Sequence, residues 1–394
     1  MRASEELYDD LDSWLAQSYR WQDQRHLKVL LYMVRALLYS GSVNLSKWSS
    51  YLPGRCAQSQ QRRLSRWLGN PRIVVHELYS GIIQAALSDW QQHEMFLALD
   101  TSMLWNEFCL VRLVVVHRGR GLPVSWCVLR HRSSSVAYSA YQSVIQRAAA
   151  VVPDGVSVIV LADRGFVHTD LMAALSQMGW HYRIRLKSEC WVKRGARPWR
   201  QLNSYHLSAG EAILFWYVKL HKEKPFSSVY IVLARTTTDE IWAVVSDQPV
   251  SLNTLKEYAL RFSIEETFLD DKSNGFELER SRIRSAQKLE RLCFVLAIAT
   301  LYLTAHGVAV VESGQRRTVD VHWFRGNSYF RIGWDWLRRA LCLGQWRPFA
   351  IAVRFGTTLE TEPVLPSLKY VYKQFSLDFS LVELPTRRNK GDPR

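Results

Sequence analysis

The hydrophobic periodicity of the chain changes at Met95, where helical repeats give way to short apolar runs. Short apolar runs bounded by turn residues are typical of buried strands, and repeats of three to four residues are typical of helices. The order along the chain is strand, strand, strand, helix, strand, helix, strand. The strands are expected at residues 96–100, 109–118, 123–132, 156–163 and 181–187, and the helices at residues 134–152 and 171–180. This order predicts an α/β domain with a mixed sheet.

Between about residues 188 and 250, strands follow one another without helices. The runs lie at residues 212–221, 228–235 and 240–246. We expect an all-β insertion here, inside an α/β domain that spans residues 91–310. Helical periodicity returns at about Leu252 and is expected to continue to Asp271, and a further helix is expected at about residues 286–304.

Residues 1–90 have helical periodicity and are expected to form a small helical N-terminal domain. A short helix near Leu45, a turn at Pro53 and a second helix over about residues 57–68 resemble a helix-turn-helix. The second helix carries Arg62, Arg63 and Arg66. Arginines on such a helix contact phosphates and base edges in a major groove. An ordinary helical hairpin with a charged face has the same pattern, so both readings stay open here.

The composition favours a polyanionic partner. The chain has 51 Lys and Arg against 36 Asp and Glu, a formal net charge of +15, and such an excess is typical of nucleic-acid-binding proteins. The six cysteines form no CxxC pair, which argues against a zinc ribbon and fits the reducing cytoplasm. Residues 292–311 are apolar and long enough to cross a membrane, but a buried helix has the same pattern, and we expect no membrane partner.

Two of the expected strands end in an aspartate, Asp100 in LALDTS and Asp163 in VLADRGF. Residues just past strand ends face a common crevice in α/β sheets. Two carboxylates there offer the hard oxygen ligands that Mg²⁺ prefers, and a pair of metal ions supports phosphoryl transfer. Taken alone, strand-end aspartates are also common turn formers and helix caps.

A third acid lies in the expected helix YALRFSIEETFLDDK. Successive helix residues are turned by about 100°, so Tyr258, Arg261, Glu265 and Lys272 would project from one stripe, with Glu266 off it. Two cations beside one carboxylate suit a site where the carboxylate binds metal and the cations bind DNA phosphates. A solvated charged face with favourable side-chain pairs is the simpler alternative.

The spacing Y-x2-R-x3-E-x6-K at these four positions resembles the signature of the DDE transposases of one large class of bacterial insertion sequences. ALDTS and ADRGF resemble the surroundings of that family's two aspartates. The resemblance covers about residues 90–305 and implies an RNase H-like catalytic core. It also implies a β insertion between the second aspartate and the glutamate.

The resemblance assigns roles to individual residues. It implies that Asp100, Asp163 and Glu265 are the catalytic residues and the ligands of two Mg²⁺ ions, for which Mn²⁺ is a substitute. It implies DNA contacts by Tyr258, Arg261, Lys272, Arg185, Lys187 and Arg164. It also aligns Trp242 with a tryptophan that stacks on a flipped base, although a Trp entering a strand is as often a core residue.

The expected function is that of a DNA transposase, which cleaves insertion-sequence ends and joins them to target DNA through a hairpin intermediate. The expected partners are the terminal inverted repeats, target DNA and a second copy in a homodimer on DNA, in the bacterial cytoplasm. Residues 311–394, rich in Trp and Arg, are expected to dimerise or contact DNA. Two alternatives remain: a transposase-derived DNA-binding protein without catalysis, and a related RNase H-like structure-specific nuclease.

Overall fold

The computed structural model of the 394-residue chain describes most of the sequence. The described residues are 2–19, 21–54, 56–90, 94–223, 225–272, 275–321, 327–344, 353–356 and 377–382. Much of the expected C-terminal region, including Trp323 and Arg325, lies outside them.

The chain folds into two compact units. The first comprises residues 1–159 and 261–368, and the second comprises residues 160–260 and 369–394. This division differs from the expected sequence of three domains. The N-terminal helices belong to the first unit because they share its core with the first strands and the long helix α10 (Ala286–Glu312).

The first unit begins with helices. They are α1 (Arg2–Ser18), α2 (Gln24–Ser40), α3 (Leu45–Ser49), α4 (Ala57–Leu68) and α5 (Val75–Ala86). α2 ends as expected at a glycine stop, since Gly41 adopts the left-handed conformation at φ 61° and its N–H bonds the carbonyl of Leu37. The expected helices near Leu45 and at residues 57–68 are confirmed.

An antiparallel meander follows. Its strands are β1 (Met95–Leu104), β2 (Phe108–His117) and β3 (Arg120–Leu129). After α6 (Tyr138–Ala149) the chain returns to the sheet as β4 (Val158–Ala162), which is the hydrogen-bonded neighbour of β1. The order in this part of the sheet is therefore β3-β2-β1-β4.

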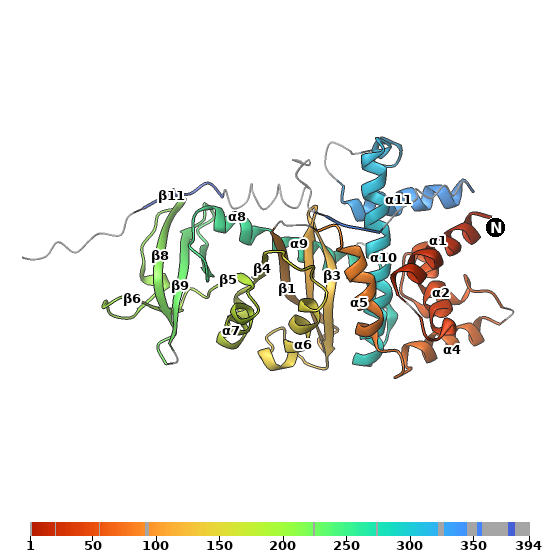
Figure 1. Cartoon of the computed structure of the whole chain (residues 1–394), viewed down its shortest axis with the longest axis horizontal. Coiled ribbons are helices and arrows are strands. Elements are labelled where there is room, and N and C mark those ends of the chain that lie inside the picture. The colour runs from red at the N-terminus through yellow and green to blue at the C-terminus, as the bar shows by residue number, and fades with distance from the viewer. Residues whose placement is uncertain are drawn as a thin grey trace, which may run out of the picture. The chain divides into compact units, whose positions relative to one another are not determined.

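The apolar run at residues 292–311 lies within the helix α10. Its buried side chains face all directions, as expected for a helix enclosed by protein. It is long and apolar enough to cross a membrane, and 83% of its most apolar window is buried inside the protein. Figure 1 shows α10 beside α5 and crossed by α11 (Tyr329–Cys342).

Two glycines allow that crossing. A Cβ atom on Gly307 of α10 would lie 1.8 Å from the carbonyl oxygen of Tyr329, and one on Gly333 of α11 would lie 1.9 Å from that of Leu303. Only glycine permits backbones to approach this closely. The remaining elements of the first unit are α9 (Phe262–Lys272) and two short helical turns, Leu278–Ser281 and Arg316–Thr318.

The second unit carries the rest of the sheet, in the order β4-β5-β10-β9-β8-β6-β7. The strands are β5 (His181–Arg185), β6 (Trp191–Arg194), β7 (Arg200–Gln201), β8 (Glu211–Leu220), β9 (Phe226–Arg235), β10 (Ile241–Ser246) and β11 (Ser380–Leu381), which pairs with β8. The helical elements are α7 (Thr169–Gln177), α8 (Asn253–Ala259) and the turns Arg164–Phe166 and Leu202–Ser204.

The expected α/β architecture is confirmed. The first five strands are hydrogen-bonded in the order β3-β2-β1-β4-β5, with helices after β3 and β4, which is the arrangement of an RNase H-like core. The three longer strands of the expected insertion are present as β8, β9 and β10. The insertion does not form a sheet of its own, because β10 pairs with β5 and so extends the core sheet.

Candidate active site

Asp100 lies in the middle of β1 and not at its end. β1 continues to Leu104, and Asp100 is paired across the ladder with Arg112 of β2. The expectation that the strand stops at the aspartate is therefore wrong, because the antiparallel partner β2 supplies backbone hydrogen bonds beyond it. The Asp100 side chain is 15% exposed, and its Oδ1 accepts a 2.7 Å hydrogen bond from the N–H of Thr101.

Glu265 lies in the first turn of α9, where the helix dipole favours a negative charge. Its side chain is half exposed. Arg261 lies just before the helix. One guanidinium N–H of Arg261 donates to Asp100 Oδ2 at 2.8 Å, and an N–H on the other terminal nitrogen donates to Glu265 Oε1 at 2.8 Å. One guanidinium therefore holds two of the three predicted acids on neighbouring nitrogens. Sequence spacing predicted that Arg261 and Glu265 share a face but not that Arg261 bonds Asp100.

α9 is anchored to the sheet by its inward-facing acids. Asp271 forms a buried ion pair with Arg112 of β2, and Asp270 and Glu266 both pair with Arg120 of β3. Burial raises the pKa of Asp270 to about 7, against the opposing effect of Arg120. These ion pairs hold α9 against β2 and β3, and so hold Glu265 near Asp100 on β1.

A close contact with Gly121 brings α9 near β3. The Thr267 hydroxyl accepts from the N–H of Gly121 at 2.9 Å and donates to its carbonyl at 3.1 Å. A Cβ on residue 121 would lie 2.5 Å from Val114 Cγ2 and 3.0 Å from the Thr267 oxygen. Glycine is required here because any side chain would push helix and strand apart.

Lys272 ends α9 and donates Nζ to the carbonyl of Met103 on β1 at 2.7 Å. Burial lowers the pKa of Lys272. The predicted signature cation therefore joins the end of the helix to the strand that carries Asp100.

Tyr258 does not share the helical stripe. The expected continuous helix from Leu252 to Asp271 is broken between Ala259 and Phe262 into α8 and α9, although the segment contains neither Gly nor Pro. The break follows from tertiary packing. Tyr258 is fully buried against Trp242, with ring centroids 5.6 Å apart, and its helix α8 is tied to β5 by the Arg183–Glu257 ion pair at 2.8 Å.

Trp242 is a core residue in this structure. Its exposed fraction is 0%, and its indole N–H donates to Glu240 at 3.2 Å. Arg185 lies over the Trp242 ring at 5.5 Å and pairs with Glu240. A base cannot stack on an enclosed ring, and Arg185 is already engaged by a carboxylate. The predicted DNA contacts of Trp242 and Arg185 stay predictions, and both side chains would have to leave Glu240 to reach DNA.

Asp163 directly follows β4 as expected and caps the turn Arg164–Phe166, with its Oδ1 accepting from the N–H of Gly165 at 2.8 Å. Arg164 and Lys187 are exposed. Asp163 therefore has the capping role that strand-end aspartates often have, through its Oδ1.

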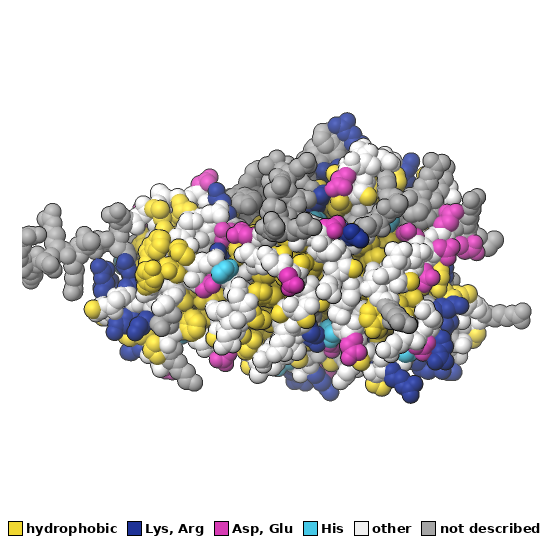
Figure 2. Space-filling model, in the orientation of Figure 1, with side chains coloured by type: hydrophobic (Ala, Val, Ile, Leu, Met, Phe, Trp, Pro, Cys, Tyr) yellow, Lys and Arg dark blue, Asp and Glu magenta, His cyan; other side chains and the backbone are white. Residues whose placement is uncertain are grey.

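The predicted DNA-reading helix is α4. Arg62 and Arg66 are exposed, whereas Arg63 is half-buried, with its guanidinium 5.4 Å from the Tyr32 ring centre. Gln60 bonds the carbonyl of Pro53 and Gln61 bonds Ser46 of α3, so both glutamines hold the hairpin together. Figure 2 shows Lys and Arg side chains gathered at the end of the first unit that carries α4.

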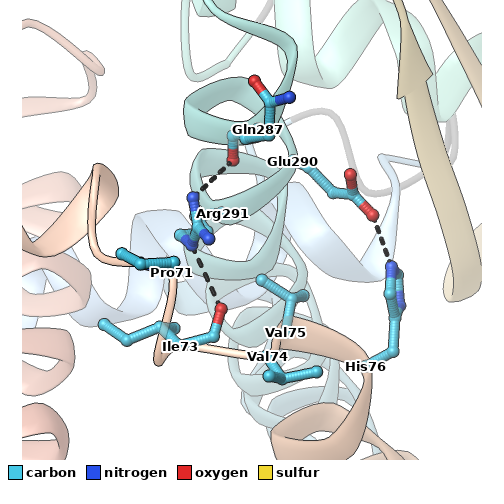
Figure 3. Close-up of a pocket in the computed structure, with 8 residues that line it drawn as sticks. All are labelled: Pro71, Ile73, Val74, Val75, His76, Gln287, Glu290 and Arg291. Carbon is cyan, nitrogen blue, oxygen red and sulfur yellow. Dashed lines mark hydrogen bonds and ion pairs between the residues drawn. The ribbon is translucent and has the colours of Figure 1, made fainter.

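A pocket of about 200 Å³ lies between the α4–α5 connection and α10 (Figure 3). His76 contacts Glu290 at 2.6 Å, and Arg291 donates to the carbonyl of Ile73 at 3.1 Å. The polar groups of this pocket are thus paired with one another. They join the N-terminal helices to α10, and none of the predicted site residues lines the pocket.

The acids suit a hard divalent cation, because carboxylate oxygens are the ligands that Mg²⁺ prefers. Asp100 and Glu265 meet at a single guanidinium, so their oxygens face the same point. Within the part of the chain that the structure describes, no three His, Cys, Asp or Glu side chains form a group that could hold a metal ion.

Comparisons with known proteins identify the fold family. Residues 108–302 match the model of the transposase DDE domain, a range that includes Asp163 and Glu265 and begins after Asp100. No curated protein sequence matches significantly. Among solved structures, the chain resembles a piggyBac transposase in a synaptic complex with hairpin DNA, with TM-score 0.43 and 10% identity over 98% of this chain and 84% of that one. The transposase DDE domain at residues 108–302 places this chain in the DDE transposase family.

Proposed function

We propose that this protein is the transposase of a bacterial insertion sequence, and that it cleaves the ends of the element and joins them to target DNA. The DDE transposase family consists of enzymes that cleave and join DNA and generally use divalent metal ions. One observation supports an active site in this chain above the others. Arg261 holds Asp100 and Glu265 together although Asp100 lies 161 positions away in the sequence.

We propose Asp100, Asp163 and Glu265 as the ligands of two Mg²⁺ ions, with Mn²⁺ as a substitute. When bound, these ions would lower the pKa of a water and stabilise the leaving oxygen of a phosphodiester. In the absence of cation, Arg261 compensates the charges of Asp100 and Glu265, which would otherwise repel each other. Once the acids are engaged by cations, the guanidinium is available for a DNA phosphate, its preferred bidentate partner.

The proposed reaction is a series of phosphoryl transfers without a protein nucleophile. Water attacks the phosphodiester at the end of the element and releases a 3′-OH. This 3′-OH attacks the phosphodiester of the opposite strand, which forms a hairpin on the element end and releases the flanking DNA with a 3′-OH. Water opens the hairpin and frees the 3′-OH of the element again, which then attacks a target phosphodiester and displaces a target 3′-OH. Two ends must be joined in one complex, so we propose a homodimer on DNA.

The test is cleavage of a duplex that carries the inverted repeat found beside the gene. The full-length protein is incubated with the labelled duplex and Mg²⁺, Mn²⁺ or chelator, and the products are resolved on a denaturing gel. Nicked and hairpin products that require the cation support the proposal. Binding without cleavage at any cation concentration would identify a DNA-binding derivative. Cleavage that follows DNA structure and ignores the repeat would identify a structure-specific nuclease.

A further inference from the structure

The β insertion carries two large aromatic residues side by side on one face. Between the pairs Phe215–Ile231 and Val218–Val229, β8 has two residues, Trp216 and Tyr217, where β9 has one, Tyr230. This is a β-bulge, which turns consecutive side chains toward the same side of a sheet. Trp216 is 49% exposed and Tyr217 is 68% exposed, although aromatic residues of this size are usually largely buried.

The backbone at the bulge is strained. Tyr217 has φ 54°, the left-handed region that a bulky residue rarely adopts. Glycine would adopt this conformation without strain, yet the chain has an aromatic here. Backbone strain retained at an exposed position often marks a functional site. The rings of Trp216 and Tyr217 both contact the ring of Tyr230, at centroid distances of 5.8 Å and 5.2 Å. The bulge therefore brings three aromatic rings together.

Lysines lie on the same face. Lys219 follows Val218 on β8 and is exposed, and it is paired directly across the ladder with Lys193 of β6. Like charges at directly opposite positions destabilise a sheet unless an anion lies between them. Trp191, at the start of β6, is also exposed and has Lys222 over its ring at 5.4 Å. Figure 2 shows hydrophobic and basic side chains next to one another over the strands β6, β8 and β9.

We propose that this aromatic–basic face, formed by Trp191, Lys193, Trp216, Tyr217, Lys219 and Tyr230, binds unpaired nucleotides of a DNA strand. Exposed aromatic rings stack on bases whatever their sequence, and lysines between them neutralise the phosphates. Duplex DNA hides its base faces and would engage only the lysines. The inference rests on the proposed function for the choice of DNA as ligand. It places a strand-binding surface outside the acid site, for the single strand exposed when an end is opened.

The experiment measures binding without cation, so that it is independent of cleavage. A fluorescent single-stranded oligo-dT of about 15 nucleotides is titrated with the full-length protein and followed by anisotropy. The same titration uses an abasic strand of equal length and charge, and a duplex. We expect oligo-dT to bind about 10-fold or more tightly than the abasic strand, since stacking on one aromatic contributes a factor of about 5 to 150.

Two variants test the rings. Trp216→Ala and Tyr217→Gly are each expected to weaken oligo-dT binding about 5- to 100-fold and to leave abasic binding nearly unchanged. Tyr217→Gly removes the strain at φ 54°, so its melting temperature should equal or exceed that of the parent protein. A loss of binding in this variant cannot then be explained by unfolding.

The lysines are tested by salt dependence. Lys219→Ala should lower the slope of log affinity against log salt by about 0.7, the value for one single-strand phosphate contact. Lys256→Ala changes an exposed lysine of α8 in the same unit and should leave the slope unchanged.

Three results would overturn the proposal. Equal binding of abasic and normal strands would exclude stacking, and unchanged binding in both ring variants would exclude this face. If the ring variants instead abolish self-association in sedimentation experiments and bind DNA normally, the face is a protein interface. The two proposals can also be told apart. If the protein binds single strands through this face but does not cleave the repeat, the proposed function is contradicted and this inference is supported.

Discussion

Arg261 and Asp100 are 161 residues apart in the sequence and form a 2.8 Å ion pair in the structure. The same guanidinium bonds Glu265, so a cation of the protein itself occupies the position between two acids. The arrangement resembles a site prepared for a divalent cation, with arginine as its internal counterion. The acid site can therefore be tested by thermal unfolding with and without divalent cation, in the absence of DNA.

Substitutions of the three acids should abolish cleavage and spare binding of the ends. Asp100→Asn, Asp163→Asn and Glu265→Gln each remove a charged oxygen ligand and are expected to lower the cleavage rate by about 100-fold or more, since even residues that only orient metal ligands cost about 10- to 100-fold. Glu266→Gln is the control, because Glu266 faces Arg120. A full cleavage rate in any acid variant would remove that residue from the site.

Replacing Arg261 should make the protein depend on divalent cation for stability. In Arg261→Ala the charges of Asp100 and Glu265 are no longer compensated, so the melting temperature without cation should fall by about 1–2 °C, the change expected for roughly 1 kcal/mol in a unit of this size. Mg²⁺ should then raise the melting temperature more in this variant than in the parent protein, because no guanidinium competes for the carboxylates.

The control for this experiment is the double variant Arg261→Ala with Glu265→Gln. It removes one of the two repelling charges and should lose most of the extra response to Mg²⁺. An equal response to Mg²⁺ in the parent protein and in Arg261→Ala would mean that the cation does not bind between these acids.

Asp270 should make stability fall as pH rises. Burial raises its pKa to about 7 in the folded protein, whereas the unfolded chain releases the proton near pH 4. The native state therefore binds more protons between these values, and the contribution of Asp270 to stability is present at low pH and lost as pH approaches 7. Asp270→Asn, which is neutral throughout, should show a smaller drop in melting temperature from pH 5 to pH 8. Identical profiles in both proteins would rule out this effect, and Asp170→Asn at an exposed position serves as control.

Trp242→Ala should act on stability before it acts on any single step of the reaction. A fully buried Trp truncated to Ala costs about 3–5 kcal/mol. Thermal unfolding should show this loss, and nicking and hairpin formation should slow together in a labelled time course. Trp216→Ala in the same unit removes a half-exposed ring and should leave the melting temperature nearly unchanged. A normal melting temperature for Trp242→Ala, together with a selective loss of hairpins, would support the base-stacking role.

The exposed arginines of α4 should contribute phosphate contacts to end binding. Arg62→Gln with Arg66→Gln is expected to lower the slope of log affinity against log salt by about 1.8, which corresponds to two duplex contacts. Arg25→Gln is the matched control, since Arg25 is an exposed arginine of α2 already paired with Asp23 at 2.9 Å. If the slope does not change, α3 and α4 form a hairpin that is only structural.

Local patterns in the sequence were sufficient for the element order. The five core strands, α4 and the three longer strands of the insertion lie where periodicity predicts them, because alternation and helical repeats report which side of an element is buried. That Asp100 and Glu265 belong to one site was predicted only by the family resemblance. No local pattern indicates that a residue in β1 and one in α9 meet.

The acid motifs, the Arg261–Glu265 spacing and the apolar core helix were determined by the sequence itself, since each depends on neighbours within a few residues. Tertiary structure alone decided the rest. It broke the Tyr258–Lys272 segment into two helices, because Tyr258 packs on Trp242 while α9 is anchored by Arg112 and Arg120. It enclosed Trp242, and it exposed Trp216 and Tyr217 through a bulge set by the register with β9. Burial and register arise from contacts between distant segments, which no window of sequence contains.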